Sequence, residues 1–506
     1  MWLNDVISIL YPELLVLLAV VIGIVLSTTK FQDIIWITST LLMLTGVIYI
    51  IKNQLNIAHH TQILGGMFIL DHLSSIFRLL ILIVAILIIL GSVKYSEGFK
   101  HKSEFMIILL TSTLAAMFLV GANDLITLFV ALETLSLSSI MLAGYSKYDP
   151  RSNEASLKYL LNSASASAIF LFGLSILYGL TGSTQFYDIK YHLLQLYNEG
   201  NLNQSTMAVT LILIVGGLAF KLAACPLHMW SPDVYEGAPT PTTAYLSVLS
   251  KASAFAVTLR IIFNIFDFAF KLWQPILIII SILSMVIGNL IALGELINKA
   301  SIKRLMAYSS IAQIGYVLIG LALFKNETVS SSIFYLIIYS IMNLGAFLCI
   351  IAFGNEADSD SISDYGGLIT KRPLLVFAFC VCLFNLAGLP LPPAGFIAKF
   401  ILIKASFEAG TLGIFIGSIA LLTTIISIYY YSYIAKIMIV DKPKAAVLNI
   451  DSNKDALGKS NELNIAIAIS VCAIFLLALT SNPLLNLSNK VTNSISESKQ
   501  TVGYNF

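Results

Sequence analysis

Long apolar segments, separated by short polar links, run along almost the whole chain. A helix rises 1.5 Å per residue, so about 20 apolar residues cross the hydrocarbon core of a bilayer. The segments fall near residues 8–28, 32–52, 66–92, 104–121, 123–145, 156–181, 207–225, 242–262, 274–297, 303–324, 329–353, 373–407, 411–437 and 462–482. The pattern predicts an all-α polytopic membrane protein with about 14 transmembrane helices.

Proline interrupts the seventh and the twelfth of these segments. The seventh ends at Pro226, and the twelfth is too long for one straight crossing and contains LPLPP at 389–393. The flanking sequences resemble each other, because FKLAACPLH (220–228) aligns with FNLAGLPLP (384–392), and residues 135–144 resemble residues 309–320. The two breaks lie five crossings apart, so the copies have opposite orientation. This predicts two inverted five-helix repeats with broken helices 7 and 12, as in many transporters.

The repeats divide the chain into four predicted parts. These are 1–103 with helices 1–3, 104–262 with helices 4–8, 263–437 with helices 9–13, and 438–506 with a polar loop and helix 14. The longest polar stretches, 182–205 and 440–461, are expected to lie at the surface.

Composition and charge agree with a membrane protein and suggest its orientation. The chain is 58% hydrophobic and 11% charged, whereas soluble domains carry about 25% charged residues. Links after odd-numbered segments hold about 17 basic residues, and the opposite side holds about eight. Since cytoplasmic loops are enriched in Lys and Arg, we expect the odd links on the cytoplasmic side and both termini on the non-cytoplasmic side.

Among the few charged residues inside the apolar segments, four are candidates for chemistry: Glu133, Lys221, Lys251 and Lys399. Intramembrane charges are costly and mark functional sites more often than not. Apolar surroundings disfavour the charged form of a lysine, and a nearby carboxylate favours it, so such residues can take up and release protons. We predict that Glu133 pairs with Lys221 and that the three lysines form a lateral proton relay. The alternative is that each lysine reaches an interface or makes only a static pair.

Two further positions have competing interpretations. His228, just beyond the Pro226 break, is a possible relay residue or a hydrogen-bonded histidine beside Trp230. Asp71 and Arg78 lie seven residues apart on one predicted helix face, and we expect them to pair structurally.

The sequence contains no pattern that indicates a bound cofactor or metal. A Gly-rich phosphate loop, a haem or iron–sulfur cysteine pattern and metal-ligand spacing are all missing from it. The five cysteines lie in or beside apolar segments and are interpreted as packing residues.

Two motifs resemble a known family. FKLAACPLHMWSPDVYEGAPTP (220–241), followed by SVLSK (247–251), resembles the signature of the antiporter-like membrane subunits of respiratory complex I. IKRLMAYSSIAQIGY (302–316) is similar to a second signature of that family. The chain length, the span count and SNPL at 481–484 agree with the member that lacks a long C-terminal lateral helix.

This resemblance implies a fold, a function and a set of partners. It implies two five-helix bundles, a Glu133–Lys221 pair, Lys251 as the central lysine and Lys399 as the distal pumping residue. It also implies coupling of quinone reduction elsewhere in the complex to proton translocation through this chain. NADH, FMN, iron–sulfur clusters and quinone would bind to other subunits, and the partners would be neighbouring membrane subunits. The membrane would be a bacterial inner membrane or a thylakoid.

Two other functions remain open at this stage. The same fold and first signature also occur in subunits of multi-protein Na+/H+ antiporters. A passive assembly scaffold, with purely structural lysines, would carry the same charges without moving protons.

Overall fold

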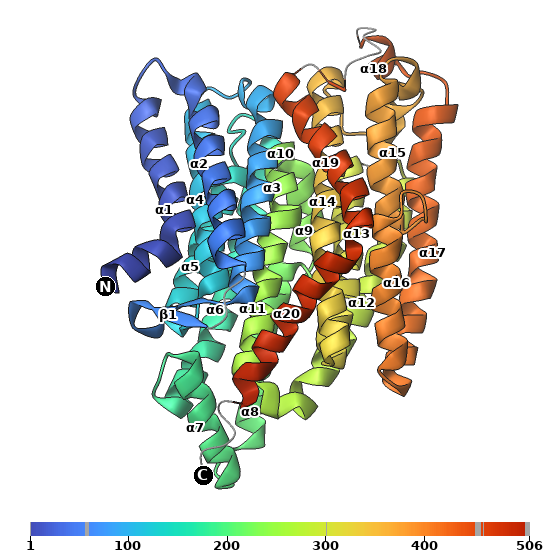
Figure 1. The fold of residues 1–506 in the computed structure, drawn as a ribbon. Helices are drawn as coiled ribbons and strands as arrows, with labels where there is room; N and C mark the ends of the chain where they lie inside the picture. Colours follow the sequence, from blue (N-terminus) through green and yellow to red (C-terminus); the bar gives the residue numbers. More distant parts are fainter. Residues whose placement is uncertain (1, 56–59, 300, 451–456, 459, 501–506) are drawn as a thin grey trace.

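The computed structural model describes residues 2–55, 60–299, 301–450, 457–458 and 460–500 of the chain. Within these residues, 13 helices are long and apolar enough to cross a membrane. They stand side by side in one elongated bundle, with their axes roughly parallel (Figure 1). This confirms the predicted all-α polytopic membrane fold.

The long helices follow the apolar segments of the sequence closely. They are α1 (Trp2–Ser27), α2 (Ile35–Tyr49), α3 (His72–Ser96), α4 (Lys102–Gly121), α5 (Leu125–Ala143), α6 (Pro150–Thr181), α8 (Gln204–Leu222), α12 (Phe270–Ile297), α13 (Ile302–Leu323), α14 (Asn326–Ala357), α17 (Thr411–Val440) and α19 (Asn461–Leu479), together with the span formed by α10 (Thr240–Tyr245), the π-helical turn η4 (Leu246–Ser250) and α11 (Lys251–Asn264).

Both predicted proline breaks are present as gaps between helices. After α8 the chain leaves the helix and resumes as α9 (Trp230–Gly237), and α15 (Pro373–Ala387) is separated from α16 (Ala394–Glu408) by six residues. α15 and α16 are each too short to span alone. Counted together as one broken helix, they bring the 13 long helices to the 14 spans that the sequence predicts.

The centre of the bundle is the most buried part of the chain. The apolar centres of the span Thr240–Asn264 and of helices α13 and α14 are entirely buried, whereas α1, α17 and α19 expose much of their apolar surface. Lys251 lies on one of these central helices, so its charge is removed from both lipid and bulk water.

Several short elements were not predicted. β1 (Thr61–Ile63) pairs antiparallel with β2 (Phe68–Leu70), so helix α3 begins later than the sequence suggested. The polar stretch before α8 contains α7 (Phe186–Asn198). Lys190 of this helix forms an ion pair of 2.9 Å with Asp267. α18 (Ala445–Leu448) lies in the polar segment before α19, and short turns are η1 (Gln32–Ile34), η2 (Ile50–Gln54), η3 (Leu64–Gly66), η5 (Asp267–Ala269), η6 (Ile362–Tyr365) and η7 (Leu368–Thr370).

A further helix, α20 (Ser481–Gln500), follows the last predicted span. It runs obliquely across the bundle (Figure 1) and contacts α3, α11 and α14. Its residues Ser488, Val491 and Thr492 are buried. Their spacing places them on one face of the helix. The helix was missed because its sequence is mostly polar and only this narrow face packs inward.

The predicted Asp71–Arg78 pair is wrong. Asp71 precedes α3 and caps it by accepting a hydrogen bond from the Ser74 amide at 2.7 Å. Its two carboxylate oxygens accept hydrogen bonds from Arg260 of α11 at 2.8 and 3.0 Å. Burial alone would raise the pKa of the Asp71 carboxyl, but Arg260 and Ser74 outweigh it and hold that pKa below its usual value.

Arg78 has a different acidic partner. Its guanidinium donates to Glu13 of α1 at 2.9 Å and to Gln54 of η2 at 2.7 Å, and both ionic side chains are fully buried. Sequence spacing put Asp71 and Arg78 on one face, but a cap residue lies outside the helix and its side chain turns back toward the first turn. The two pairs therefore connect α3 to α1 and to α11.

Candidate functional site

The first break ends α8 at Leu222, one residue after Lys221. Ala223 adopts a left-handed conformation (φ 53°) that stops the helix, and Pro226 has no N–H to continue it. Trp230, at the start of α9, donates to the carbonyl of Phe220 at 3.0 Å and stacks on Tyr159 of α6, with ring centroids 4.6 Å apart. This aromatic contact fixes the position of Lys221 next to the break.

Lys221 and Glu133 lie near each other, and each binds its own serine hydroxyls. The Lys221 ammonium donates to Ser136 of α5 and, at 3.2 Å, to Ser163 of α6, while Glu133 accepts a hydrogen bond from Ser167 of α6. Among the described residues the two charges make no direct ion pair, contrary to the simple pairing that the sequence suggested. Glu133 is half-buried and Lys221 is buried. The Glu133 carboxylate is therefore more accessible from outside the bundle than the Lys221 ammonium.

Lys251 begins α11, immediately after the π-helical turn η4. Its ammonium donates to Ser310 of α13 at 2.8 Å and lies 5.9 Å from the centroid of the Tyr235 ring. No carboxylate pairs with Lys251 in the part of the chain that the structure describes. Only 1% of the residue is exposed, which excludes the interpretation that this lysine reaches an interface.

His228 lies in the first break and is buried. Neither ring nitrogen has a well-aligned hydrogen-bond partner among the described residues. The nearby hydroxyls of Ser231 and Tyr235 also lack one. Buried polar groups of this kind usually bind ordered water. His228 therefore stays a predicted relay residue, with the hydrogen-bonded histidine beside Trp230 as its alternative.

Lys399 of α16 turns back across the second break. Its ammonium donates to the carbonyls of Leu386 and Ala387 at 2.9 and 3.1 Å, and lies 5.0 Å from the Tyr316 ring centroid. The Leu386 carbonyl is free because residue Pro390, which would donate to it in a continuous helix, has no N–H. The break thus supplies acceptors for a buried cation.

Asn385 occupies the position that aligns with Lys221 in the sequence repeat. Its side chain donates to the Val381 carbonyl at 2.8 Å and accepts from the Gly395 amide at 2.9 Å, so it connects the two halves of the broken helix. A Cβ atom on Gly395 would lie 2.0 Å from the Asn385 carbonyl oxygen, so only glycine fits there. The two breaks therefore differ, with a lysine at one and a structural amide at the other.

The serine hydroxyls that contact the buried lysines were not predicted from the sequence. Ser136, Ser163 and Ser310 each hold a lysine ammonium. The only sequence signal was indirect, because Ser136 and Ser310 belong to the weaker matching pair of repeat segments. Intramembrane serines are common, so their type alone carried no prediction.

Two cavities are lined by charged residues, and one of them includes Lys399. An apolar one of about 420 Å³ reaches Lys399 from the side, between α16 and α17, and is walled by Phe396, Phe400 and Phe407. A polar one of about 500 Å³ lies at the α9–α10 link and includes Glu236, Thr240 and the Lys303–Asp360 ion pair of 2.8 Å, in which Lys303 is buried and Asp360 is partly exposed.

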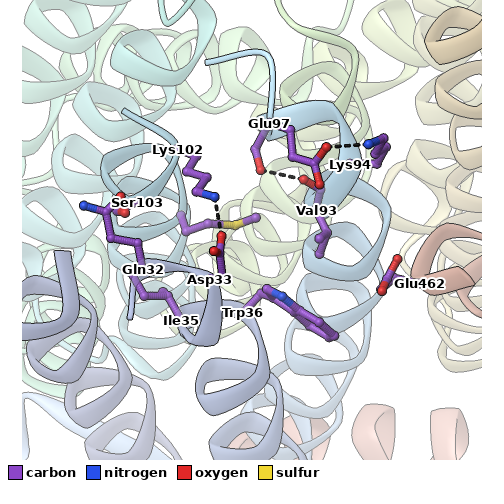
Figure 2. Close-up of a pocket in the computed structure, with 12 residues that line it drawn as sticks. Gln32, Asp33, Ile35, Trp36, Val93, Lys94, Glu97, Lys102, Ser103 and Glu462 are labelled. Atoms are coloured by element: carbon purple, nitrogen blue, oxygen red, sulfur yellow. Dashed lines mark hydrogen bonds and ion pairs between the residues drawn. The ribbon is translucent and has the colours of Figure 1, made fainter. Parts of the chain in front are cut away.

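A third cavity, of about 220 Å³, lies apart from the lysines where the α1–α2 link meets α3 and α4 (Figure 2). Its charges are largely matched, because Lys94 pairs with Glu97 and Lys102 pairs with Asp33. Glu462 of α19 lines the same cavity, so the cavity lies where the α1–α2 link, α3, α4 and α19 meet.

Gly388 offers a test of how strictly Lys399 must be placed. Its φ of 85° is unfavourable for other residues, and an added Cβ would lie 2.8 Å from Cδ of Lys399. We expect Gly388→Ala to cost about 1–2 kcal/mol in backbone strain and to displace the lysine. Proton uptake measurements on membrane vesicles should show a severalfold loss.

Gly410→Ala is the matched control for this variant. Gly410 also has a positive φ (109°), but nothing lies within 4 Å of an added Cβ. Equal losses in the two variants would mean that backbone strain, and not the position of Lys399, causes the effect.

Comparison with known proteins identifies the family of the chain. The family model described as NADH:quinone oxidoreductase/Mrp antiporter, TM, matches residues 122–440. The NAD(P)H-quinone oxidoreductase subunit 2 of Synechococcus elongatus is 43% identical over 451 residues, which cover 88% of this chain and 84% of that protein.

Solved structures show the same fold. A chain of respiratory complex I from Thermus thermophilus is 27% identical, with a TM-score of 0.75 and coverage of 94% of this chain and 99% of that one. A chain of the Mrp complex from Dietzia sp. has a TM-score of 0.82 at 23% identity, over 97% of this chain and 98% of that one. The matched region contains both breaks and the residues Glu133, Lys221, Lys251 and Lys399, and the chain belongs to the NADH:quinone oxidoreductase/Mrp antiporter transmembrane family.

Proposed function

We propose that the chain is a proton-translocating membrane subunit of an NAD(P)H-quinone oxidoreductase complex. The observation that carries this proposal is the set of three buried lysines, each held by hydroxyls or carbonyls and not by a direct carboxylate pair. A lysine in such a site has no fixed counter-ion to lock its charge. Small changes in its surroundings can therefore make it bind or release a proton.

The four charges have distinct proposed roles. Glu133, half-buried on α5, modulates Lys221 through Ser136, Ser163 and Ser167. Lys251 is the central relay group between the repeats 104–262 and 263–437, and Lys399 is the distal group. His228 has the proposed role of binding water between Lys221 and Lys251, and its buried ring nitrogens without well-aligned partners support that role.

The remaining parts of the enzyme belong to other subunits in this proposal. Quinone reduction, flavin and iron–sulfur chemistry would take place there, and the energy would reach this chain through neighbouring membrane subunits. The similarity to the cyanobacterial subunit 2 supports this assignment. We propose a bacterial inner membrane or a thylakoid as its location, with both termini on the non-cytoplasmic side.

A subunit of a multi-protein Na+/H+ antiporter has weaker support. The likeness to the Mrp complex chain is 23% identical and concerns the fold, whereas the quinone oxidoreductase relative is 43% identical over most of both chains.

Replacing Lys399 by alanine tests the proposal against a close control. Proton translocation driven by NADH or NADPH in membrane vesicles should fall at least about tenfold, with normal amounts of assembled complex. Lys404→Ala, five residues along the same helix, removes an exposed lysine that pairs with Glu408 at 3.8 Å, and should leave translocation unchanged. Full translocation in Lys399→Ala and in the equivalent Lys221 and Lys251 variants would support the scaffold alternative.

A further inference from the structure

Helix α13 connects the surroundings of the central and the distal lysine. Ser310, which accepts the hydrogen bond from Lys251, is followed three residues later by Gln313. Residues three apart lie on one helix face, one turn along the axis. Both side chains are fully buried, so Gln313 is the next polar group on α13 after the contact with Lys251.

Gln313 and Lys399 bind the same oxygen atom. The side-chain amide of Gln313 donates to the Leu386 carbonyl at 3.2 Å, and the Lys399 ammonium donates to it at 2.9 Å. A carbonyl has two lone pairs and can accept both bonds. However, each donor draws on the same electron density, so the presence of Gln313 weakens the hold of this oxygen on the ammonium.

Tyr335 of α14 fixes the orientation of the Gln313 amide. Its hydroxyl donates to the amide oxygen, which leaves the nitrogen facing Leu386. Tyr335 is fully buried, and an amide in this arrangement has no freedom to turn its oxygen toward Lys399. The amide therefore acts on Lys399 only through the shared carbonyl.

The charged and titratable groups around Lys399 are few. Tyr316 of α13 faces it at 5.0 Å from ring centroid to ammonium, and Tyr335 reaches it only through Gln313. α15 contributes the two carbonyls, and α17 contributes Thr424 to the cavity beside the lysine. On α16 itself, Lys404 and Glu408 pair with each other at the cavity rim. No carboxylate pairs with Lys399 among the described residues.

We propose that Gln313 is a positioning residue that lowers the proton affinity of Lys399 by sharing the Leu386 carbonyl. The inference rests on the proposed relay, in which Lys399 must release a proton in each cycle. An amide holds no proton itself at physiological pH, so Gln313 adjusts its neighbour without becoming a further relay group. The hydrogen bond that stabilises the ammonium is thereby kept weak enough for release.

Two variants change the proton affinity of Lys399 in the same direction by different amounts. Gln313→Met, combined with Tyr335→Phe to avoid an unpaired buried hydroxyl, leaves the Leu386 carbonyl to the ammonium alone. Gln313→Glu keeps an acceptor for Tyr335 and places a carboxylate near the ammonium. The pH at which Lys399 releases its proton should then rise by about 1–3 units. A lysine that holds its proton more tightly needs a higher pH to release it.

The test is the pH profile of proton translocation by the whole complex in membrane vesicles. The acid limb should move to higher pH by about half a unit to one unit in the Met/Phe double variant, and further in Gln313→Glu. Gln274→Met is the matched control, because Gln274 also donates to a helix carbonyl, Ala322, at 3.0 Å, but lies away from Lys399. Its profile should be unchanged.

The outcomes separate this inference from the proposed function. Unchanged acid limbs in both Gln313 variants, with Lys399→Ala inactive, would overturn the role of Gln313 and leave the relay intact. Normal translocation in Lys399→Ala would overturn both. A uniform loss at every pH, without a shift, would indicate a purely structural glutamine and also count against the inference.

Discussion

Proton translocation should fall at least about tenfold when Lys251 is replaced by methionine. Methionine keeps most of the length and volume of the lysine side chain but cannot bind a proton, so the relay is interrupted at its centre. The site tolerates the change, because the lysine is buried among apolar and aromatic side chains and donates to a single serine. Loss of a buried charge should not reduce the stability of the fold.

The measurement is the ratio of protons moved to quinone reduced in membrane vesicles, together with the amount of assembled complex. Lys271→Met is the control, since Lys271 is an exposed residue at the start of the neighbouring helix α12. A normal ratio in Lys251→Met would mean that protons pass this part of the bundle without the central lysine. The ratio distinguishes this result from a general loss of enzyme.

The second large effect concerns stability. Arg260→Leu leaves the Asp71 carboxylate buried without its bidentate partner, and breaking a buried ion pair in this way costs about 3–5 kcal/mol. Arg260 also donates to the Val120 carbonyl at 3.1 Å, so α3, α4 and α11 lose a common connection. We expect a marked drop in the Tm of the purified complex and less of it in the membrane.

Adding Asp71→Asn to Arg260→Leu should recover most of this loss. Asparagine is neutral and still caps α3, so the double variant contains no unpaired buried charge. The native carboxyl has a pKa below its usual value, so the pair stabilises the protein at neutral pH. This contribution is lost as the pH falls through that lowered pKa. A double variant no more stable than Arg260→Leu would show that the contact with Val120 matters more than the charge.

The membrane itself explains why so much of the fold could be predicted. Backbone groups in lipid must be paired within a helix, so each apolar segment of sufficient length had one outcome, and Pro226 and Pro390 marked the places where that rule fails. Buried lysines stand out for the same reason. Position along the sequence was therefore enough to find Lys221, Lys251 and Lys399.

The partners of these residues could not be predicted, because they come from distant helices. Asp71 pairs with Arg260 and not with Arg78, and Lys221 contacts serines of α5 and α6. Which faces meet depends on helix rotation and crossing geometry, and periodicity along one helix contains no information about its neighbour. The same holds for Gln313, which looks like an ordinary polar residue until the second break is placed beside it.

The π-helical turn before Lys251 has a consequence for how this region can vary among related proteins. Such a turn holds one residue more than an α-helical turn of the same height, and a single residue corresponds to about 100° of rotation. Deleting any one residue of 246–250 would turn Lys251 away from Ser310, whichever side chain was lost. We therefore expect the length of this turn to stay constant among related proteins, in addition to the packing that constrains its buried side chains.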